Sequence, residues 1–140
     1  MTDPLFALVI HDHDEALKEL EGILKDLSVE SWRITNCDSA ESLIAQYKPS
    51  MIFIGLPVWE RSHQQLVDLC RKADLALNII VVGTMPDIEL YVAAIERGAF
   101  SFIAPPFTHD GLNIIVHSAA IDARERRDAM ARAVVAALHG

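Results

Sequence analysis

Two histidines and two aspartates follow one another in the segment His11-Asp12-His13-Asp14. Imidazole and carboxylate groups bind transition-metal ions, so this cluster is a candidate metal site. Alternate side chains of an extended chain point to opposite sides, which would separate the two histidines from the two aspartates. No further set of ligands occurs at metal-binding spacing, and Asp14 is well placed to cap a following helix. We therefore favour a structural role for the cluster and predict no bound metal or other cofactor.

Three more candidate positions for chemistry follow short apolar runs. They are Gly55, Gly83-Thr84 and Pro105-Pro106. If the runs are parallel strands, these positions and the His-Asp cluster lie side by side at one edge of a sheet. No serine, cysteine or histidine is paired with a base at these strand ends outside that cluster, so nucleophilic catalysis has no support. We expect the chain not to be an enzyme.

Apolar patterns of two kinds alternate along the chain and predict the elements that position these residues. Short continuous apolar runs indicate strands buried on both faces, and apolar residues spaced by three and four indicate amphipathic helices. Five such strand–helix units predict an α/β fold with a doubly wound, five-stranded parallel sheet. Strands are expected at 5–10, 31–37, 51–54, 78–82 and 100–103, and helices at 14–27, 39–47, 62–73, 87–97 and from 108 onward.

The last predicted helix, 108–138, is longer than a sheet of this size requires. At a rise of ~1.5 Å per residue it reaches ~46 Å, whereas ~20 Å would cover the sheet. Its second half carries an apolar stripe that includes Met130 and Val134. The stripe has two open interpretations: a linker helix that frays, or a helix that pairs with a second copy of itself. We expect a domain at 4–122 and an extended helix or linker at 123–140.

The charge balance is acidic, with 12 lysines and arginines against 20 aspartates and glutamates and a net charge of −8. Nucleic-acid binding depends on neutralising phosphates, so this domain is not expected to bind DNA or RNA itself. Its apolar runs are far shorter than the ~20 residues that span a membrane. Cys37 and Cys70 stand alone in the sequence, which favours reduced thiols and a cytoplasmic protein.

Three segments of the sequence resemble the receiver domain of bacterial two-component response regulators, and the resemblance as a whole extends over nearly all of 4–122. They are Val9 to Leu20, Pro49 to Leu56, and Arg97 to Phe107. The last is similar to the family's Gly-Ala segment that ends in Lys-Pro-Phe. The resemblance implies a (βα)5 flavodoxin-like fold. It also implies a phosphorylation switch made of an acidic pair that holds Mg²⁺, an acceptor aspartate, a Thr or Ser, and a Lys.

Most of these groups are replaced in this chain, so the resemblance implies a pseudo-receiver that accepts no phosphoryl group. Asp14 is an alternative candidate for the second acid of the pair. The resemblance also implies a cis peptide bond before Pro106. The matching positions are Asp12 and His13 for the acidic pair, Gly55 for the acceptor, Gly83 (with Thr84 beside it) for the hydroxyl, Pro105 for the lysine, and Phe102 for the switch aromatic.

The resemblance further implies regulation through protein contacts, in the N-terminal part of a longer signalling or transcriptional regulator. A homodimer is expected, and either the chain's own output domain or a regulatory protein is the expected further partner. The alternative is a small-molecule or nucleotide-sensing module that uses the vacated acidic pocket. Trp59 is expected in a loop that covers this pocket, with a partner contact as its alternative role. The expected interface residues are Ile88, Tyr91, Leu112, Val116, Met130 and Val134.

Overall fold

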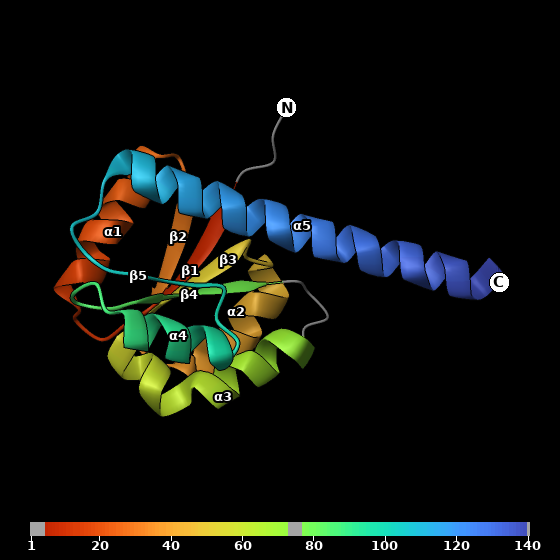
Figure 1. Cartoon of the computed structure of the whole chain (residues 1–140), viewed down its shortest axis with the longest axis horizontal. Coiled ribbons are helices and arrows are strands. Elements are labelled where there is room, and N and C mark those ends of the chain that lie inside the picture. Colours follow the sequence, from red (N-terminus) through yellow and green to blue (C-terminus); the bar gives the residue numbers. More distant parts are fainter. Residues whose placement is uncertain (1–4, 73–76, 140) are drawn as a thin grey trace.

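The computed structural model describes residues 5–72 and 77–139, which form a parallel five-stranded sheet between two layers of helices (Figure 1). The strand order is β2-β1-β3-β4-β5, so the predicted doubly wound α/β fold is confirmed. The strands are β1 (Phe6–Ile10), β2 (Glu30–Ile34), β3 (Met51–Gly55), β4 (Asn78–Val82) and β5 (Ser101–Ile103). The helices are α1 (Glu15–Asp26), α2 (Ala40–Tyr47), α3 (Leu56–Lys72), α4 (Ile88–Glu96) and α5 (His109–His139), with a short 3₁₀ turn, η1 (Cys37–Ser39).

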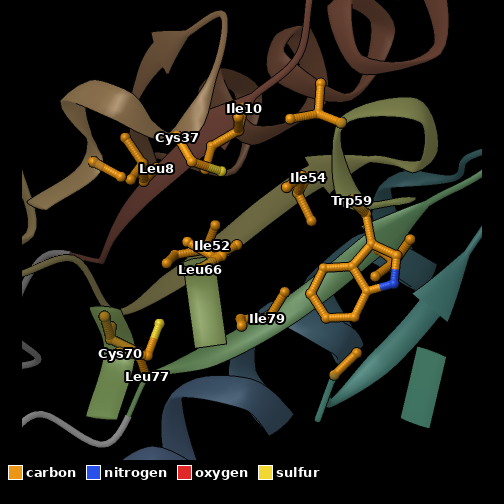
Figure 2. Close-up of a cluster of buried hydrophobic side chains, with 14 of the residues drawn as sticks. Leu8, Ile10, Cys37, Ile52, Ile54, Trp59, Leu66, Cys70, Leu77 and Ile79 are labelled. Atoms are coloured by element: carbon orange, nitrogen blue, oxygen red, sulfur yellow. The ribbon is translucent and has the colours of Figure 1, made fainter. Parts of the chain in front are cut away.

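The core has two apolar layers, one on each face of the sheet. Helices α1 and α5 cover one face, and α2, α3 and α4 cover the other (Figure 1). Every residue of β3 and β4 is buried, which explains why β3 and the part of β4 after Asn78 are continuous apolar runs rather than alternating patterns. Figure 2 shows the layer beneath α2 and α3, where side chains from β1, β3 and β4 meet Leu66 and Cys70 of α3.

Side chains at the helix starts account for three of the predicted boundaries. Asp14 Oδ1 accepts a hydrogen bond from the Ala16 N–H at 2.9 Å, and Asp87 Oδ1 accepts one from the Leu90 N–H at 3.1 Å. Thr108 Oγ1 accepts one from the N–H of Gly111 at 2.9 Å. Each bond satisfies a backbone donor that has no partner within its helix.

Helix α3 begins at Leu56, directly after β3, and not at Ser62 as the sequence predicted. Pro57 suggested a break, but a proline in the first turn of a helix has a suitable φ and removes no hydrogen bond. Trp59 consequently lies in the first turn of α3 and points into the core, where it is 1% exposed (Figure 2). Both predicted roles of Trp59, the lid and the partner contact, are therefore wrong.

Helix α5 continues well past the sheet, as its sequence predicted (Figure 1). Its exit is fixed by Asn78, the first residue of β4. The Asn78 Nδ2 donates hydrogen bonds to the Ala119 carbonyl at 2.8 Å and to Asp122 Oδ2 at 3.0 Å. Arg126 donates to Asn78 Oδ1 and lies 3.0 Å from Asp122 Oδ2. No helix in the described residues is long and apolar enough to cross a membrane.

Candidate functional site

The loops at the carboxyl ends of β1, β3, β4 and β5 gather most of the predicted site residues at one edge of the sheet. Gly55 ends β3, and its missing side chain would point toward two residues of the first loop. A Cβ placed on Gly55 would lie 3.4 Å from Asp14 Oδ2, 3.5 Å from His11 Cβ and 3.1 Å from Leu17 Cδ1. The groups that face Gly55 are therefore Asp14, His11 and Leu17.

Asp12 and His13 do not face this position. Their side chains are 63% and 85% exposed and lie against each other at 3.6 Å. His13 has a φ of 56°, so the extended backbone ends before it and the expected alternation of side chains fails. His11 is buried while His13 is in solvent, so the predicted placing of the two histidines on one side is wrong. Of the carboxylates in this loop, Asp14 is the one that lies at Gly55.

His11 is part of a hydrogen-bonded network that the sequence did not reveal. Its Nδ1 accepts a bond from the Asp14 N–H at 3.1 Å, and its Nε2 lies 2.6 Å from Glu21 Oε1. Because Nδ1 accepts, the ring proton is on Nε2 and is donated to Glu21. Arg33 of β2 lies 3.6 Å from the same carboxylate oxygen. Both ring nitrogens are thus occupied by protein partners, and the part of the chain that the structure describes holds no group of three or more metal-ligating side chains.

The end of β4 is closed by an aromatic ring. A Cβ placed on Gly83 would overlap Cζ of Phe102 and lie 3.1 Å from its Cε2. The Phe102 ring is buried, whereas Thr84 is exposed. The ring therefore takes the space that a side chain at position 83 would need.

The loop after β5 contains the Pro105-Pro106 peptide bond, which is cis as predicted. Pro105 is partly buried and brings no charge to this edge of the sheet. The strand ends therefore combine one carboxylate that caps a helix, one histidine with both nitrogens bonded, two glycines and a proline. Gly55 has no side chain that could act as a nucleophile, and Pro105 carries no cationic group.

Comparisons with known proteins agree with this geometry in fold and sequence. No family model matches the chain. It is 30% identical over 125 residues to the nitrogen assimilation regulatory protein NtrX of Azorhizobium caulinodans, a match that covers 86% of this chain and 27% of NtrX. It is 24% identical over 112 residues to the regulatory protein AtoC of Escherichia coli, covering 80% and 24%. The chain thus spans about a quarter of the length of these relatives.

Solved structures of response regulators are also similar to this chain. NtrX of Brucella abortus, determined in complex with ATP, superposes with a TM-score of 0.76 and 26% identity over 91% of this chain and 29% of that one. A CheY-like receiver domain protein from Methanospirillum hungatei superposes with a TM-score of 0.70 and 14% identity, over 89% and 99%. The chain is a response-regulator receiver domain.

The interface residues predicted for this receiver domain fall into two groups. Ile88 and Tyr91 on α4, and Met130 and Val134 on the extension of α5, are exposed. Leu112 and Val116 are buried against the sheet, so their predicted place in an interface is wrong. The reason is that the first half of α5 uses its apolar stripe to close the domain's own core, and only the second half leaves the stripe uncovered.

Proposed function

We propose that this receiver domain is a phosphorylation-independent regulatory module that forms homodimers and has no catalytic activity of its own. It acts in the cytoplasm as the N-terminal part of a longer signalling or transcriptional regulator. The observation that supports the proposal is that β3 ends in Gly55, the residue that the resemblance aligns with the acceptor aspartate. No acyl phosphate can form without that carboxylate.

The surroundings of Gly55 support the same conclusion. Asp14 faces the position, but its Oδ1 is engaged in capping α1. The hydroxyl position is Gly83, covered by the Phe102 ring, and the lysine position is Pro105. The acceptor, hydroxyl and lysine positions are thus occupied by Gly55, Gly83 and Pro105. Apolar atoms, those of the Phe102 ring and of Pro105 itself, fill the hydroxyl and lysine positions. A working switch would require changes at several of these positions together.

The decisive experiment treats the full chain with acetyl phosphate and Mg²⁺ and follows its intact mass. We expect no added phosphoryl group, while a receiver domain with an acceptor aspartate, treated in parallel, gains one. A hydroxylamine-sensitive phosphoryl group on this chain would refute the proposal.

Dimerisation is proposed from the second half of α5. The buried stripe on the first half of α5, which includes Leu112, Val116 and Ala119, continues at helical spacing into the exposed residues Met130 and Val134 of the second half. An isolated helix of this length is only marginally stable in water unless its apolar face is covered. A second copy presents the same stripe and covers it in a coiled-coil arrangement.

A pair of neighbouring valines provides the test. Val134 lies on the stripe, and the equally exposed Val135 lies about 100° further round the helix. We expect Val134→Glu to shift the full chain toward monomer in sedimentation equilibrium, and Val135→Glu to leave the association unchanged. If the two variants associate equally, the stripe on α5 does not form the dimer interface.

The partner of the module is proposed to be its own output domain, because NtrX and AtoC are about four times as long as the segment they share with this chain. The net charge of −8 argues that DNA contact, where the whole regulator makes any, belongs to another domain. A small-molecule site in the vacated pocket is the weaker alternative, because the Leu17 and Phe102 side chains lie against the two glycines.

A further inference from the structure

Strand β2 is an edge of the described sheet and is unusually open. It pairs with β1 on one side, and four of its five residues, Glu30 to Arg33, are exposed. Its main contacts are with β1 and α1, so neither face of the strand is fully covered by a helix. Exposed edge strands can pair with other strands, and this one carries no proline to prevent it.

The backbone of β2 is arranged symmetrically about Trp32. The Glu30 N–H donates to the Leu5 carbonyl and the Ile34 carbonyl accepts from the His11 N–H, so residues 30, 32 and 34 direct their backbone groups toward β1. Ser31 and Arg33 consequently direct theirs outward, because the direction alternates along a strand. The outward donors and acceptors thus lie one residue to either side of Trp32.

Trp32 lies exposed at this edge and packs against two aromatic rings. It is 45% exposed, its ring stacks on that of Tyr47 with centroids 4.7 Å apart, and Phe6 lies 6.3 Å away. The contacts fix the rotamer of a large apolar side chain that remains half in solvent. Rigid, exposed tryptophans of this kind are common at the centres of protein interfaces.

The opposite face of β2 has room for side chains from another chain. A groove of about 880 Å³ runs between α1 and β2. Gly22 lies in its wall, and a Cβ placed there would meet nothing within 4 Å. Arg33 borders the groove and is paired with Glu21 at 3.6 Å, so its charge is balanced within its own chain.

We propose that β2 pairs in antiparallel orientation with β2 of a second copy of this chain, around a twofold axis at Trp32. In this register Ser31 of each copy lies opposite Arg33 of the other, and each such pair exchanges two backbone hydrogen bonds. The two Trp32 residues form the central pair without mutual hydrogen bonds, where side chains lie closest. On the other face of the strands the α1 groove lies beside the pairing edge, and each Arg33 keeps its ion pair with Glu21 of its own chain.

A second copy fits this edge because the register is self-complementary. Ser31 and Arg33, whose backbone groups point outward, each pair with a residue of the other copy. The two Trp32 side chains meet at the axis, and the two Arg33 side chains lie diagonally rather than opposite each other. The interface is separate from the stripe on α5 and does not depend on the proposed function. A chain that uses both interfaces forms assemblies larger than a dimer.

The first test removes one outward backbone donor and leaves the β1 pairing intact. Ser31→Pro deletes the outward N–H, and Ser31→Ala keeps it while removing the same hydroxyl. Both are made in the full chain carrying Met130→Glu and Val134→Glu, so that the α5 stripe does not contribute. In sedimentation equilibrium up to roughly 100 µM we expect Ser31→Pro to raise the dimer Kd by about tenfold or more over Ser31→Ala, since two symmetry-related hydrogen bonds are lost.

Equal Kd values for the two variants would overturn the proposal. So would a monomer at all concentrations with Ser31→Ala, which would leave the edge to a strand of a different protein. Circular dichroism establishes that both variants are folded before they are compared.

The second test does not depend on the proline variant. A cysteine introduced as Trp32→Cys lies on the twofold axis, within the distance that a disulfide bridges, whereas Ser31→Cys lies off the axis. We expect an oxidised dimer with Trp32→Cys and little with Ser31→Cys. The native Cys37 and Cys70 are buried and do not compete. Equal cross-linking of the two variants would show collision rather than pairing and would refute the register.

Discussion

The ring of Phe102 lies so close to Gly83 that no side chain fits between β4 and β5 at this point. The two residues are neighbours across the parallel pair, because Phe102 lies beside Val81 and Gly83 follows one residue past the end of β4. Glycine at position 83 and an inward aromatic ring at position 102 therefore depend on each other.

Adding a Cβ at position 83 should destabilise the fold. We expect Gly83→Ala to lower the free energy of unfolding by about 1–3 kcal/mol, because the Phe102 ring must leave its place. In a chain that already carries Phe102→Ala, Gly83→Ala should cost less unfolding free energy than it does in the native chain. A double-mutant cycle in urea measures the difference. Gly22→Ala is the matched control and should be stabilising by about 0.5–1 kcal/mol, since Gly22 is inside a helix and its Cβ meets nothing. Additive effects at 83 and 102 would contradict the coupling.

Glu21 should stabilise the fold, because its carboxylate accepts a hydrogen bond from the buried imidazole of His11. We expect Glu21→Ala to cost about 1–3 kcal/mol of unfolding free energy, since the Nε2–H of His11 loses its partner. Glu21→Gln keeps a carbonyl oxygen and should recover much of this cost. Glu19→Ala, on an exposed position of the same helix, should change stability by less than about 0.5 kcal/mol. Equal stability of the Ala and Gln variants at 21 would show that the hydrogen bond contributes nothing.

Much of the fold followed from the sequence because its strongest signals are local. β1, β3 and β4 are buried on both faces, so their residues are apolar except for Asn78 at the start of β4. The caps of Asp14, Asp87 and Thr108 are contacts within one turn of helix, which spacing alone can predict. The sequence did not predict the start of α3 because Gly55 and Pro57, two residues apart, indicate the end of an element, and only the packing of Trp59 decides otherwise.

The contacts that the sequence missed join residues on different elements. His11 and Glu21 are brought together by the packing of α1 on the sheet, and Asn78 meets Asp122 across a separation of 44 residues. No local pattern encodes such pairs. The spacing of the apolar stripe on α5 likewise does not distinguish core residues from exposed ones, because it is the same at the buried Val116 and at the exposed Val134.

Asn78 should control how firmly α5 is held where it leaves the domain. We expect Asn78→Ala to lower the free energy of unfolding by about 1–3 kcal/mol, because the variant loses bonds to Ala119, Asp122 and Arg126. Amide exchange in α5 should accelerate from Ala119 toward the C-terminus. Asn113→Ala, on an exposed position of the same helix, is the control and should leave exchange unchanged. Unaltered exchange in Asn78→Ala would show that packing alone holds the helix.

The two cysteines should make the fold sensitive to alkaline pH. Burial, with a smaller contribution from Cys37, raises the pKa of the Cys70 thiol to about 12, and burial together with Asp38 raises the pKa of Cys37. The folded chain therefore holds these protons more tightly than the unfolded chain, whose thiols titrate near 9. The two protonated thiols make their full contribution to the unfolding free energy below about pH 9, and this contribution is lost as the pH rises toward 12. Cys70→Ala should flatten the fall in unfolding free energy over this interval, and an unchanged slope would contradict the assignment.

Placing a carboxylate at position 55 should not by itself make the chain a phosphoryl acceptor. The Cβ of Gly55→Asp lies 3.1 Å from Leu17 Cδ1 and 3.4 Å from Asp14 Oδ2, so the new carboxylate is crowded and faces another negative charge. The resemblance assigns Pro105 to the position of a lysine, and a proline there supplies no ammonium group to balance the charge of a bound phosphoryl group. We expect Gly55→Asp to be less stable than Gly55→Asn, which matches it in size without the charge, and to gain no phosphoryl group from acetyl phosphate with Mg²⁺. Stoichiometric phosphorylation of Gly55→Asp would show instead that the missing acceptor is the only obstacle and that the remaining side chains still support the reaction.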